Sequence, residues 1–135
     1  MIVNRVQGDV FKTPLKHIAF AVNTEGSNDS GFAGAVTSKY WPFLENTGGN
    51  TLDEVLHHTS KGKTFHALVC HELKANGWAQ TPQLVEQGLN SIPGNEEIAV
   101  VLIGSGFIGQ MAGADVKAIL GAMERSNKRI HVYSL

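Results

Sequence analysis

The sequence predicts an α/β domain in which helices cover both faces of a mixed, largely parallel sheet. Short apolar runs that suit strands alternate along the chain with segments of helical periodicity. The run 17–22 is apolar almost without alternation after His17, which is typical of a central strand that is covered on both faces. Glycine-bearing loops at 23–34 and 104–113 follow two of the apolar runs and lead directly into helical segments.

The expected strands are bounded by turn residues. The segment 2–6 alternates in polarity and ends at the turn Gly8-Asp9-Val10, and Pro14 adds a second break before the run that starts at His17. The aliphatic run 98–103 leads into a glycine loop. We expect strands at 2–6, 17–22, 65–70, 98–103 and 130–133.

Helical spacing and helix end signals mark the segments between these strands. Residues 32–40 form one helical pattern, which Pro42 closes. Thr51 and Glu54 have the spacing of a capping box and predict a short helix with its buried stripe at Leu52, Val55 and Leu56. Thr81-Pro82 predicts a further helix start, and 114–125 carries an amphipathic pattern. The inner positions of these two helices are Val85, Gly88, Leu89 and Ile92, and then Val116, Ile119, Leu120 and Met123.

Length and composition predict one soluble domain over residues 1–135. The chain has 135 residues, 42% of them apolar and 17% charged, and a net charge of −1. This charge gives no electrostatic argument for a nucleic acid or an acidic membrane as partner. The lone Cys70 suits a reducing compartment, no apolar run reaches the ~20 residues of a membrane span, and the N-terminus has no signal-peptide layout. We therefore expect a cytoplasmic protein.

The stretch 104–109 has the spacing G-x-G-x-x-G between a predicted strand and a predicted helix. This is the fingerprint of a dinucleotide-binding Rossmann unit, but there it lies on the first strand, with an acidic residue about 20 residues later. Here it precedes the last expected strand, which has no acid, so we exclude the usual NAD-binding fold. Neither this loop nor 23–34 contains Lys or Arg, so any phosphate must be bound by backbone amides and helix termini. The alternative is that both are plain tight turns.

Four segments in order resemble the macro domain, an ADP-ribose-binding module. Val6-Gln7-Gly8-Asp9-Val10 resembles its entry motif, 17–23 followed by 30–36 its first ligand loop, 103–109 its second phosphate loop, and 130–135 the closing strand of its short branch. That branch contains the terminal ADP-ribose protein glycohydrolases and the ADP-ribose-1''-phosphate phosphatases. The resemblance implies a three-layer α/β/α fold, with ADP-ribose or an ADP-ribosylated protein as partner.

The resemblance also implies binding roles for individual residues. Asp9 would accept a hydrogen bond from the adenine amine beside the Val10 amide, and Asn23 would face the distal ribose. The alternatives are a turn role for Asp9, loop capping for Asn23, and a core or chain-end role for Tyr133 and Leu135. One phosphate is assigned to the amides of Gly31, Phe32, Ala33 and Gly34. The other phosphate and the ribose are assigned to Ser105, Gly106, Phe107, Ile108 and Gly109. The adenine pocket is assigned to Tyr133 and Leu135.

The chain departs from the branch at its catalytic positions. Ile108 stands where an Asp follows the second loop, and His71 or Glu72 stands where a Lys follows the central strand, with Lys74 nearby. Asp29-Ser30 replaces glycines of the first loop. We take Asn23 and His71 as the catalytic candidates if the protein turns over substrate. The other acid–base candidates expected near the carboxyl edge of the sheet are His17, Glu25, Asp29 and Asp115, the last more naturally a helix-start residue.

No cofactor and no metal site are predicted. His66 and His71 lie an odd number of positions apart on one predicted strand and should face opposite sides, and His57 and His58 are neighbours on a predicted helix. We expect a monomer that binds ADP-ribose or a derivative, as a reader or a slow hydrolase. The alternative is a hydrolase that removes ADP-ribose, its 1''-phosphate or an O-acyl group from a modified substrate. A third reading, an RNA-binding module, is disfavoured by the charge.

Overall fold

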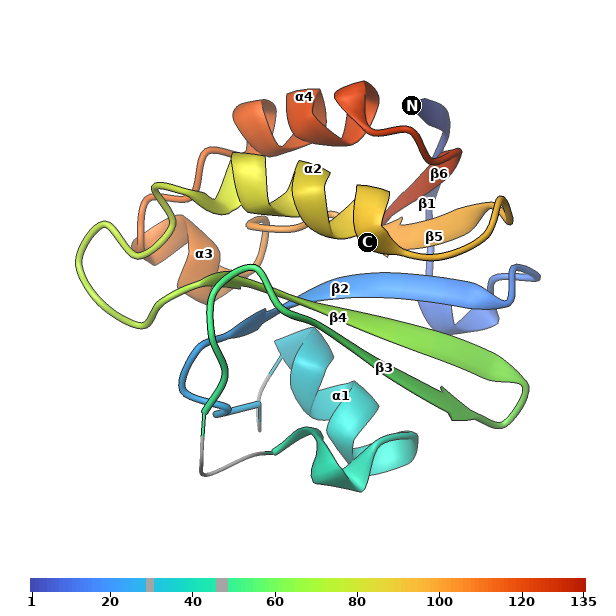
Figure 1. Cartoon of the computed structure of the whole chain (residues 1–135), viewed down its shortest axis with the longest axis horizontal. Coiled ribbons are helices and arrows are strands. Elements are labelled where there is room, and N and C mark those ends of the chain that lie inside the picture. Colours follow the sequence, from blue (N-terminus) through green and yellow to red (C-terminus); the bar gives the residue numbers. More distant parts are fainter. Residues whose placement is uncertain (29–30, 46–48) are drawn as a thin grey trace.

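One mixed sheet organises the chain. The computed structural model describes residues 1–28, 31–45 and 49–135, without the side chains of Phe107 and Ile108, and in this part of the chain six strands pair in the order β1-β6-β5-β2-β4-β3 (Figure 1). Only β3 is antiparallel to its neighbour, and the other pairings are parallel. The strands are β1 (Ile2–Gln7), β2 (His17–Asn23), β3 (Val55–Ser60), β4 (Lys63–His71), β5 (Ile98–Val101) and β6 (Ile130–Ser134).

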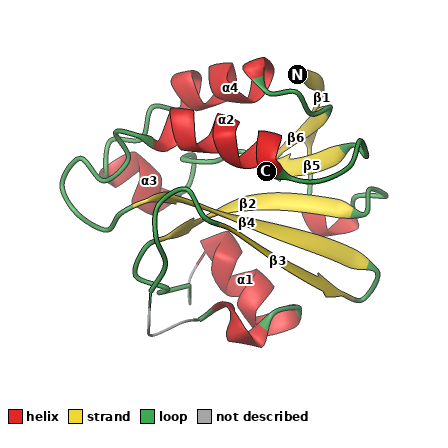
Figure 2. Ribbon diagram, in the orientation of Figure 1, coloured by secondary structure: helices red, strands yellow, loops and turns green. Residues whose placement is uncertain are grey.

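Helices cover both faces of the sheet, which confirms the predicted three-layer α/β/α arrangement. Figure 2 shows α2 (Thr81–Ser91) and α4 (Val116–Arg125) together on one face and α1 (Gly31–Lys39) on the other, while α3 (Phe107–Met111) lies at the end of the sheet. The short 3₁₀ helices η1 (Val10–Lys12) and η2 (Pro42–Leu44) complete the set of helices in the described residues.

Strand β2 is central and buried on both faces, as its continuous apolar run predicted. Ile18, Phe20 and Val22 pack into the core beneath α1, whereas Ala19 faces the core beneath α2 and α4. All four side chains are at most 1% exposed. The larger side chains therefore fill the space under one helix, and the alanine allows two helices to approach the other face.

The helix predicted from Thr51 is wrong, because this segment makes a turn and continues as strand β3. Half of the capping box forms, since the Glu54 carboxylate accepts a hydrogen bond from the Thr51 amide at 2.6 Å. The next backbone groups pair with β4 instead: the Asp53 amide donates to the Val69 carbonyl, and the Val69 amide donates to the Glu54 carbonyl. Pairing with a buried strand overrides the local helix signal, and it places Val55 and Leu56 on opposite faces of the sheet.

Two other boundaries differ from prediction. The strand expected over 98–103 ends at Val101, and the glycine loop contains the short helix α3, which its sequence did not predict. The last helix begins at Val116 because Asp115 caps it, its carboxylate accepting from the Ala118 amide at 3.0 Å. The expected helix-start role of Asp115 is thus confirmed. The predicted loop 46–50 lies partly outside the described residues.

A line of histidines lies at the edge of the sheet where β2 begins. His57 is on strand β3, not on the predicted helix, and pairs in register with His66 of β4. The His57 Nδ1 lies 2.7 Å from the His66 Nδ1, the His66 Nε2 lies 2.9 Å from the His17 Nδ1, and the His17 Nε2 lies 2.5 Å from a Glu96 carboxylate oxygen. The carboxylate can only accept, so with neutral rings each hydrogen bond is donated in one direction, from His57 through His66 and His17 to Glu96. We call this set the histidine relay.

Burial keeps the centre of the relay neutral. His66 is 3% exposed, and its desolvation, with the neighbouring His57, His17 and Lys128, lowers its pKa to about 4. In the unfolded chain the same imidazole titrates near its ordinary value of 6.5. Below that pH the unfolded chain binds a proton at His66 that the folded chain does not bind. The free energy of unfolding therefore decreases as the pH falls from about 6.5 towards 4.

We therefore expect His66 to supply a measurable part of the acid sensitivity of folding. Between pH 7.5 and pH 5 the shift corresponds to a loss of about 2 kcal/mol in the free energy of unfolding. The variant His66→Gln should lose about that much less between these two pH values than the unaltered chain. Urea unfolding at both pH values measures the difference.

The variant His58→Gln is the control, because His58 lies beside His57 on β3 but stacks on Trp41 outside the relay. It should keep the pH dependence of the unaltered chain. Identical pH dependence in His66→Gln and the unaltered chain would contradict a neutral, buried His66.

Candidate functional site

The two predicted glycine loops leave adjacent strands at one edge of the sheet. Strands β2 and β5 pair in parallel, with His17 opposite Ile98 and Ala19 opposite Val100. Their carboxyl ends therefore lie side by side, and the chain continues from them into α1 and α3 respectively (Figure 1). In a parallel sheet this edge is where ligands bind, outside the carboxyl ends of the strands.

Side-chain amides fix the beginning of the first loop. The Asn23 Nδ2 donates to the Ser27 carbonyl at 3.0 Å, and the Asn23 Oδ1 accepts from the Ser27 amide at 3.2 Å. This confirms the loop-capping alternative for Asn23, and one of its two N–H bonds is not used in this pair. Asn28, which is 2% exposed, donates from its side chain to the Leu44 carbonyl at 3.0 Å, and its backbone amide donates to the Glu45 carboxylate at 2.5 Å.

Asn28 is a structural anchor of the first loop that the sequence pattern did not predict. The loop is rich in small polar residues, and nothing in the pattern singles out Asn28 among them. Thr37 adds a tether, because its hydroxyl lies 2.8 Å from the Asn28 carbonyl and 2.9 Å from the Ala33 carbonyl. Asp29 and Ser30, which replace glycines of the first loop in the family, lie outside the described residues. The acid–base candidate Asp29 is therefore not described either.

The first loop ends in the first turn of α1, which begins at Gly31 with a φ of 61°. The amides of a first turn have no carbonyl partner within the helix, and they carry the positive end of the helix dipole. The four residues assigned to a phosphate occupy this position: Gly31, Phe32, Ala33 and Gly34. They bring neutral donors, and no cationic side chain, to the strand exit.

The second loop folds tightly on itself. A Cβ added at Gly109 would lie 2.7 Å from the Gly104 carbonyl oxygen, so this approach requires glycine. The Ser105 hydroxyl donates to the Leu102 carbonyl at 2.7 Å, and the Gln110 side chain donates to the Ser105 carbonyl at 2.7 Å. In contrast, a Cβ added at Gly106 would meet nothing within 4 Å.

Gly106 is the exposed turn of the loop, and its carbonyl accepts the first helical hydrogen bond of α3, from the Gln110 amide at 3.0 Å. The amides of the first turn of α3 include those of Phe107, Ile108 and Gly109. A second set of neutral donors therefore follows β5, at the same edge of the sheet as the set that follows β2.

The segment after β1 joins the same edge through an aromatic contact. Asp9 is exposed and caps η1, with its carboxylate accepting from the Phe11 amide at 2.9 Å, which confirms its turn role. Val10 is buried. The Phe11 ring stacks on Phe32 at 4.9 Å between centroids, so the Asp9 turn is held against the start of α1.

Of the two C-terminal candidates, Tyr133 lies next to this turn. The Tyr133 hydroxyl of β6 donates to the Thr13 hydroxyl at 2.8 Å, and its ring is only partly buried. The side chain of Leu135 is 99% exposed. Tyr133 thus stands beside the chain that follows Asp9, whereas Leu135 extends from the end of β6.

His71 is adjacent to the first loop through its backbone, while its ring is covered. The His71 carbonyl accepts from the Thr24 amide at 3.1 Å. Its imidazole is 7% exposed, stacks on Trp78 at 3.9 Å between centroids, and lies 4.0 Å from the Cys70 sulfur. Burial lowers the pKa of His71 to about 4 and raises that of the buried Cys70 thiol to about 12, so both groups are neutral at pH 7.

The remaining acid–base candidates do not meet at this edge. The expectation that His17 lies near the carboxyl edge is wrong, because it is the first residue of β2 and belongs to the histidine relay at the opposite edge. Asp115 serves as a helix cap, and Glu25 is an exposed loop residue. Glu72 faces Lys74, with 3.4 Å between the charged atoms.

Within residues 1–28, 31–45 and 49–135, no group of three or more His, Cys, Asp or Glu residues is placed to hold a metal ion. In the histidine relay the reason is geometric, because His66 directs its two ring nitrogens to two different neighbours. No helix in this part of the chain is both long enough and apolar enough to cross a membrane.

Comparison with known proteins finds likeness in structure. No family model and no curated protein matches the sequence. A protein of unknown function from Bacteroides thetaiotaomicron is similar over 100% of this chain and 98% of its own, with a TM-score of 0.75 and 17% identity. The macrodomain of Mycobacterium tuberculosis DarG is similar over 100% of this chain and 98% of its own, with a TM-score of 0.68 and 15% identity.

Thermosipho africanus DarTG, whose structure was determined in complex with ADP-ribose, is similar over 97% of this chain and 41% of its own. Its TM-score is 0.66 and its identity is 13%. The likeness covers 97–100% of this chain in these three structures, at identities that establish architecture alone. The chain has the macro-domain fold, as its four motifs predicted.

Proposed function

We propose that the protein binds ADP-ribose, free or attached to a protein, through main-chain amides at the exits of β2 and β5. The observation that carries this proposal is the parallel pairing of the two strands, which directs the loops that lead into α1 and α3 to the same edge of the sheet. Each helix end favours an anion by only about 0.3–1 kcal/mol when exposed. A diphosphate contacts both ends at once, and a single phosphate cannot.

The other groups at this edge suit the rest of the ligand. Asp9 is exposed, and the carboxylate oxygen that it does not use for its cap can accept from an adenine amine, with the Val10 amide alongside. The Phe11–Phe32 stack fixes this turn relative to the first phosphate loop. The N–H that Asn23 does not donate to Ser27 can donate to the distal ribose. Tyr133 and Leu135 complete the adenine side in this proposal.

The site favours binding over rapid turnover. Position 108 holds Ile, which has no acid–base chemistry. The His71 ring is covered by Trp78 and is nearly without solvent contact, so a water that it could activate has little access to it. We therefore propose a reader of ADP-ribose or a slow hydrolase, in which Asn23 and His71 are the residues nearest to the chemistry.

Isothermal titration calorimetry with ADP-ribose and with AMP tests the function. ADP-ribose should bind at least tenfold more tightly, because the second phosphate adds charged hydrogen bonds of about 1.5–3 kcal/mol each. Equal affinity for the two ligands would contradict a site made of two phosphate loops, and no binding of either would overturn the proposed function.

The variant Gly106→Val tests the close approach of ligand to the second loop. A Cβ added at this position meets nothing within 4 Å outside the neighbouring residues, so folding should be retained. The added side chain would occupy the space in front of the amides, and ADP-ribose affinity should fall at least tenfold. Gly121→Val on α4 is the control, since its Cβ would meet only the flexible end of Arg125 at 3.3 Å. Unchanged affinity in Gly106→Val would remove this loop from the site.

The variant Asp9→Ala tests the adenine contact. Loss of a charged hydrogen bond should weaken ADP-ribose and AMP alike, by roughly 10- to 100-fold. Asp115→Ala is a matched control, because Asp115 also caps a helix through a bond of 3.0 Å, but that helix is α4. Calorimetry should show wild-type affinity for the control. If both variants weaken binding equally, the loss comes from the helix cap and Asp9 does not contact the ligand.

A further inference from the structure

The small net charge of the chain hides an uneven distribution of charged residues. Five lysines gather where β2 begins and where the β3–β4 hairpin turns, and none of them forms an ion pair with a described residue. Of the eleven Lys and Arg residues in the chain, six lie elsewhere, together with all twelve Asp and Glu residues. A positive region thus lies on a chain whose remainder is acidic. We call it the lysine patch, and its members are Lys12, Lys16, Lys39, Lys61 and Lys63.

Hydrogen bonds hold two parts of the patch together. The Lys63 ammonium donates to the Thr13 and Leu15 carbonyls at 2.5 and 2.7 Å. This ties the β3–β4 hairpin to the segment that carries Lys12 and Lys16, both of which are exposed. Figure 1 shows the turn of this hairpin at the same end of the sheet as the beginning of β2, in agreement with the parallel pairing of β2 and β4.

Two more exposed lysines join the patch over a pair of stacked rings. Phe11 and Tyr40 stack with 5.4 Å between their centroids. The Lys39 ammonium lies 5.4 Å from the centre of the Phe11 ring, and the Lys61 ammonium lies 5.0 Å from that of Tyr40. The Lys61 ammonium also donates to the Lys39 carbonyl at 2.9 Å. Since Phe11 precedes Lys12, these contacts bring the end of α1 and the hairpin turn to the rest of the patch.

The hairpin turn carries a lysine where its geometry favours other residues. Lys61 and Gly62 are its two central residues, with φ of 53° and 78°. A turn with positive φ at both positions favours Asn, Asp or Gly, because the left-handed conformation is unfavourable for a long side chain. The geometry of the turn therefore does not explain the lysine, whereas a role for its charge at the surface does.

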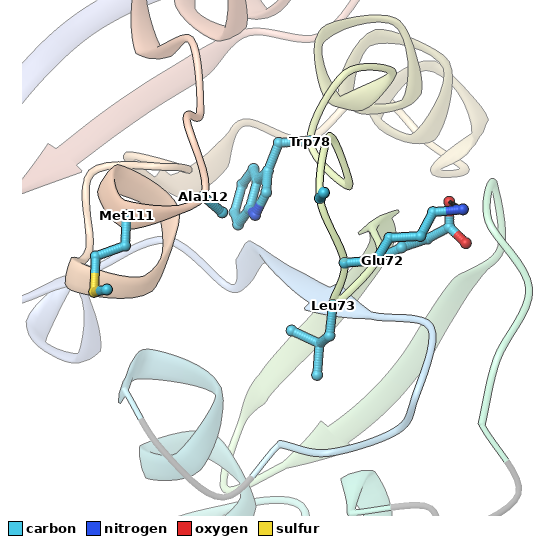
Figure 3. A pocket seen from close by; sticks show the side chains of 7 residues that line it. Glu72, Leu73, Trp78, Met111 and Ala112 are labelled. Carbon is cyan, nitrogen blue, oxygen red and sulfur yellow. Dashed lines mark ion pairs between the residues drawn. The ribbon is translucent and has the colours of Figure 1, made fainter.

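Several basic residues elsewhere on the molecule have a carboxylate partner. Figure 3 shows an open apolar pocket of about 500 Å³ between α3 and the segment that follows β4, whose only charged lining residues are Glu72 and Lys74, with 3.4 Å between their charged atoms. Arg125 of α4 pairs with Glu86 of α2 at 2.9 Å. The lysine patch has no such partner among the described residues, so its charges can attract another molecule.

We propose that the lysine patch is a docking surface for an acidic segment of a partner protein. Exposed ammonium groups without a carboxylate partner of their own attract the carboxylates of such a segment, and this charge complementarity speeds and orients association. The proposal goes beyond the binding of ADP-ribose and does not depend on it, because none of the five lysines belongs to the glycine loops at 23–34 and 104–113.

The patch suits carboxylates better than a single-stranded nucleic acid. Nucleic acids of this kind bind by stacking their bases on aromatic side chains. Here the Phe11 ring stacks on both Phe32 and Tyr40, and the Lys61 ammonium lies over Tyr40, so these rings are already occupied. The patch also contains no Arg, whose planar fork is well suited to phosphate groups.

An NMR titration of the isotope-labelled full chain with a polyglutamate peptide tests the proposal. The peptide should shift the backbone amide signals of residues 11–16, 39–40 and 61–63. The signals of residues 104–109, in the second phosphate loop, should stay unchanged. The titration gives the affinity and the location of binding together, and the spectrum shows whether each variant is folded.

The double variant Lys12→Glu with Lys16→Glu should weaken the peptide roughly tenfold or more, because two attractions become repulsions. Neither ammonium bonds to a described residue, so folding should be retained. The control is Arg5→Glu with Lys117→Glu, which changes the net charge equally at exposed residues of β1 and α4 outside the patch. Its affinity should stay within about twofold at physiological salt, where charges more than about 8 Å apart are largely screened.

Three outcomes would overturn the proposal. The first is that the polyglutamate peptide does not bind the unaltered chain, or shifts only signals outside the patch. The second is equal weakening in the two double variants, since binding would then follow net charge alone. The third is tighter binding of an oligothymidylate of the same charge than of the peptide, which would assign the patch to a nucleic acid.

Discussion

The parallel pairing of β2 between β5 and β4 is the constraint on which the site depends. Three strand exits meet at one edge because these strands run in the same direction in adjacent positions. The first loop follows the middle strand, the second loop follows one neighbour, and the chain that carries His71 and the apolar pocket follows the other. Any change of strand order would separate these three segments, whatever their sequences.

Burial of β2 explains why this pairing is fixed. The strand contributes side chains to the cores on both faces, with Phe20 beneath α1 and Ala19 beneath α2 and α4. A shift by one residue would exchange the two faces and place a phenylalanine in the space of an alanine. The register that holds the loops together is thus specified by packing far from the ligand edge.

Much of this architecture could be predicted from the sequence, because buried segments are visible in it as runs of apolar residues. The run 17–22 predicted a central strand, and glycines at 104 and 109 predicted a tight loop where the structure has one. Strand β3 could not be predicted, because Thr51 and Glu54 form a local bond that helix starts also use, while pairing with β4 decides the outcome. The histidine relay was missed for the same reason, since it joins β2, β3 and β4 across the sheet.

The absence of Lys and Arg from both loops shapes what the site can recognise. A cationic side chain attracts any nearby anion, whereas a first-turn amide is a weak donor that acts over a short range and in one direction. The first loop is also locally acidic, with Glu25 in it and Glu45 bonded to its Asn28 amide. An isolated phosphate gains little in such surroundings. In the function proposed above, a ligand that reaches Asp9, both helix starts and Asn23 together would gain several small contributions at once, so a neutral site of this kind would select for the whole ligand more than for any of its charged parts.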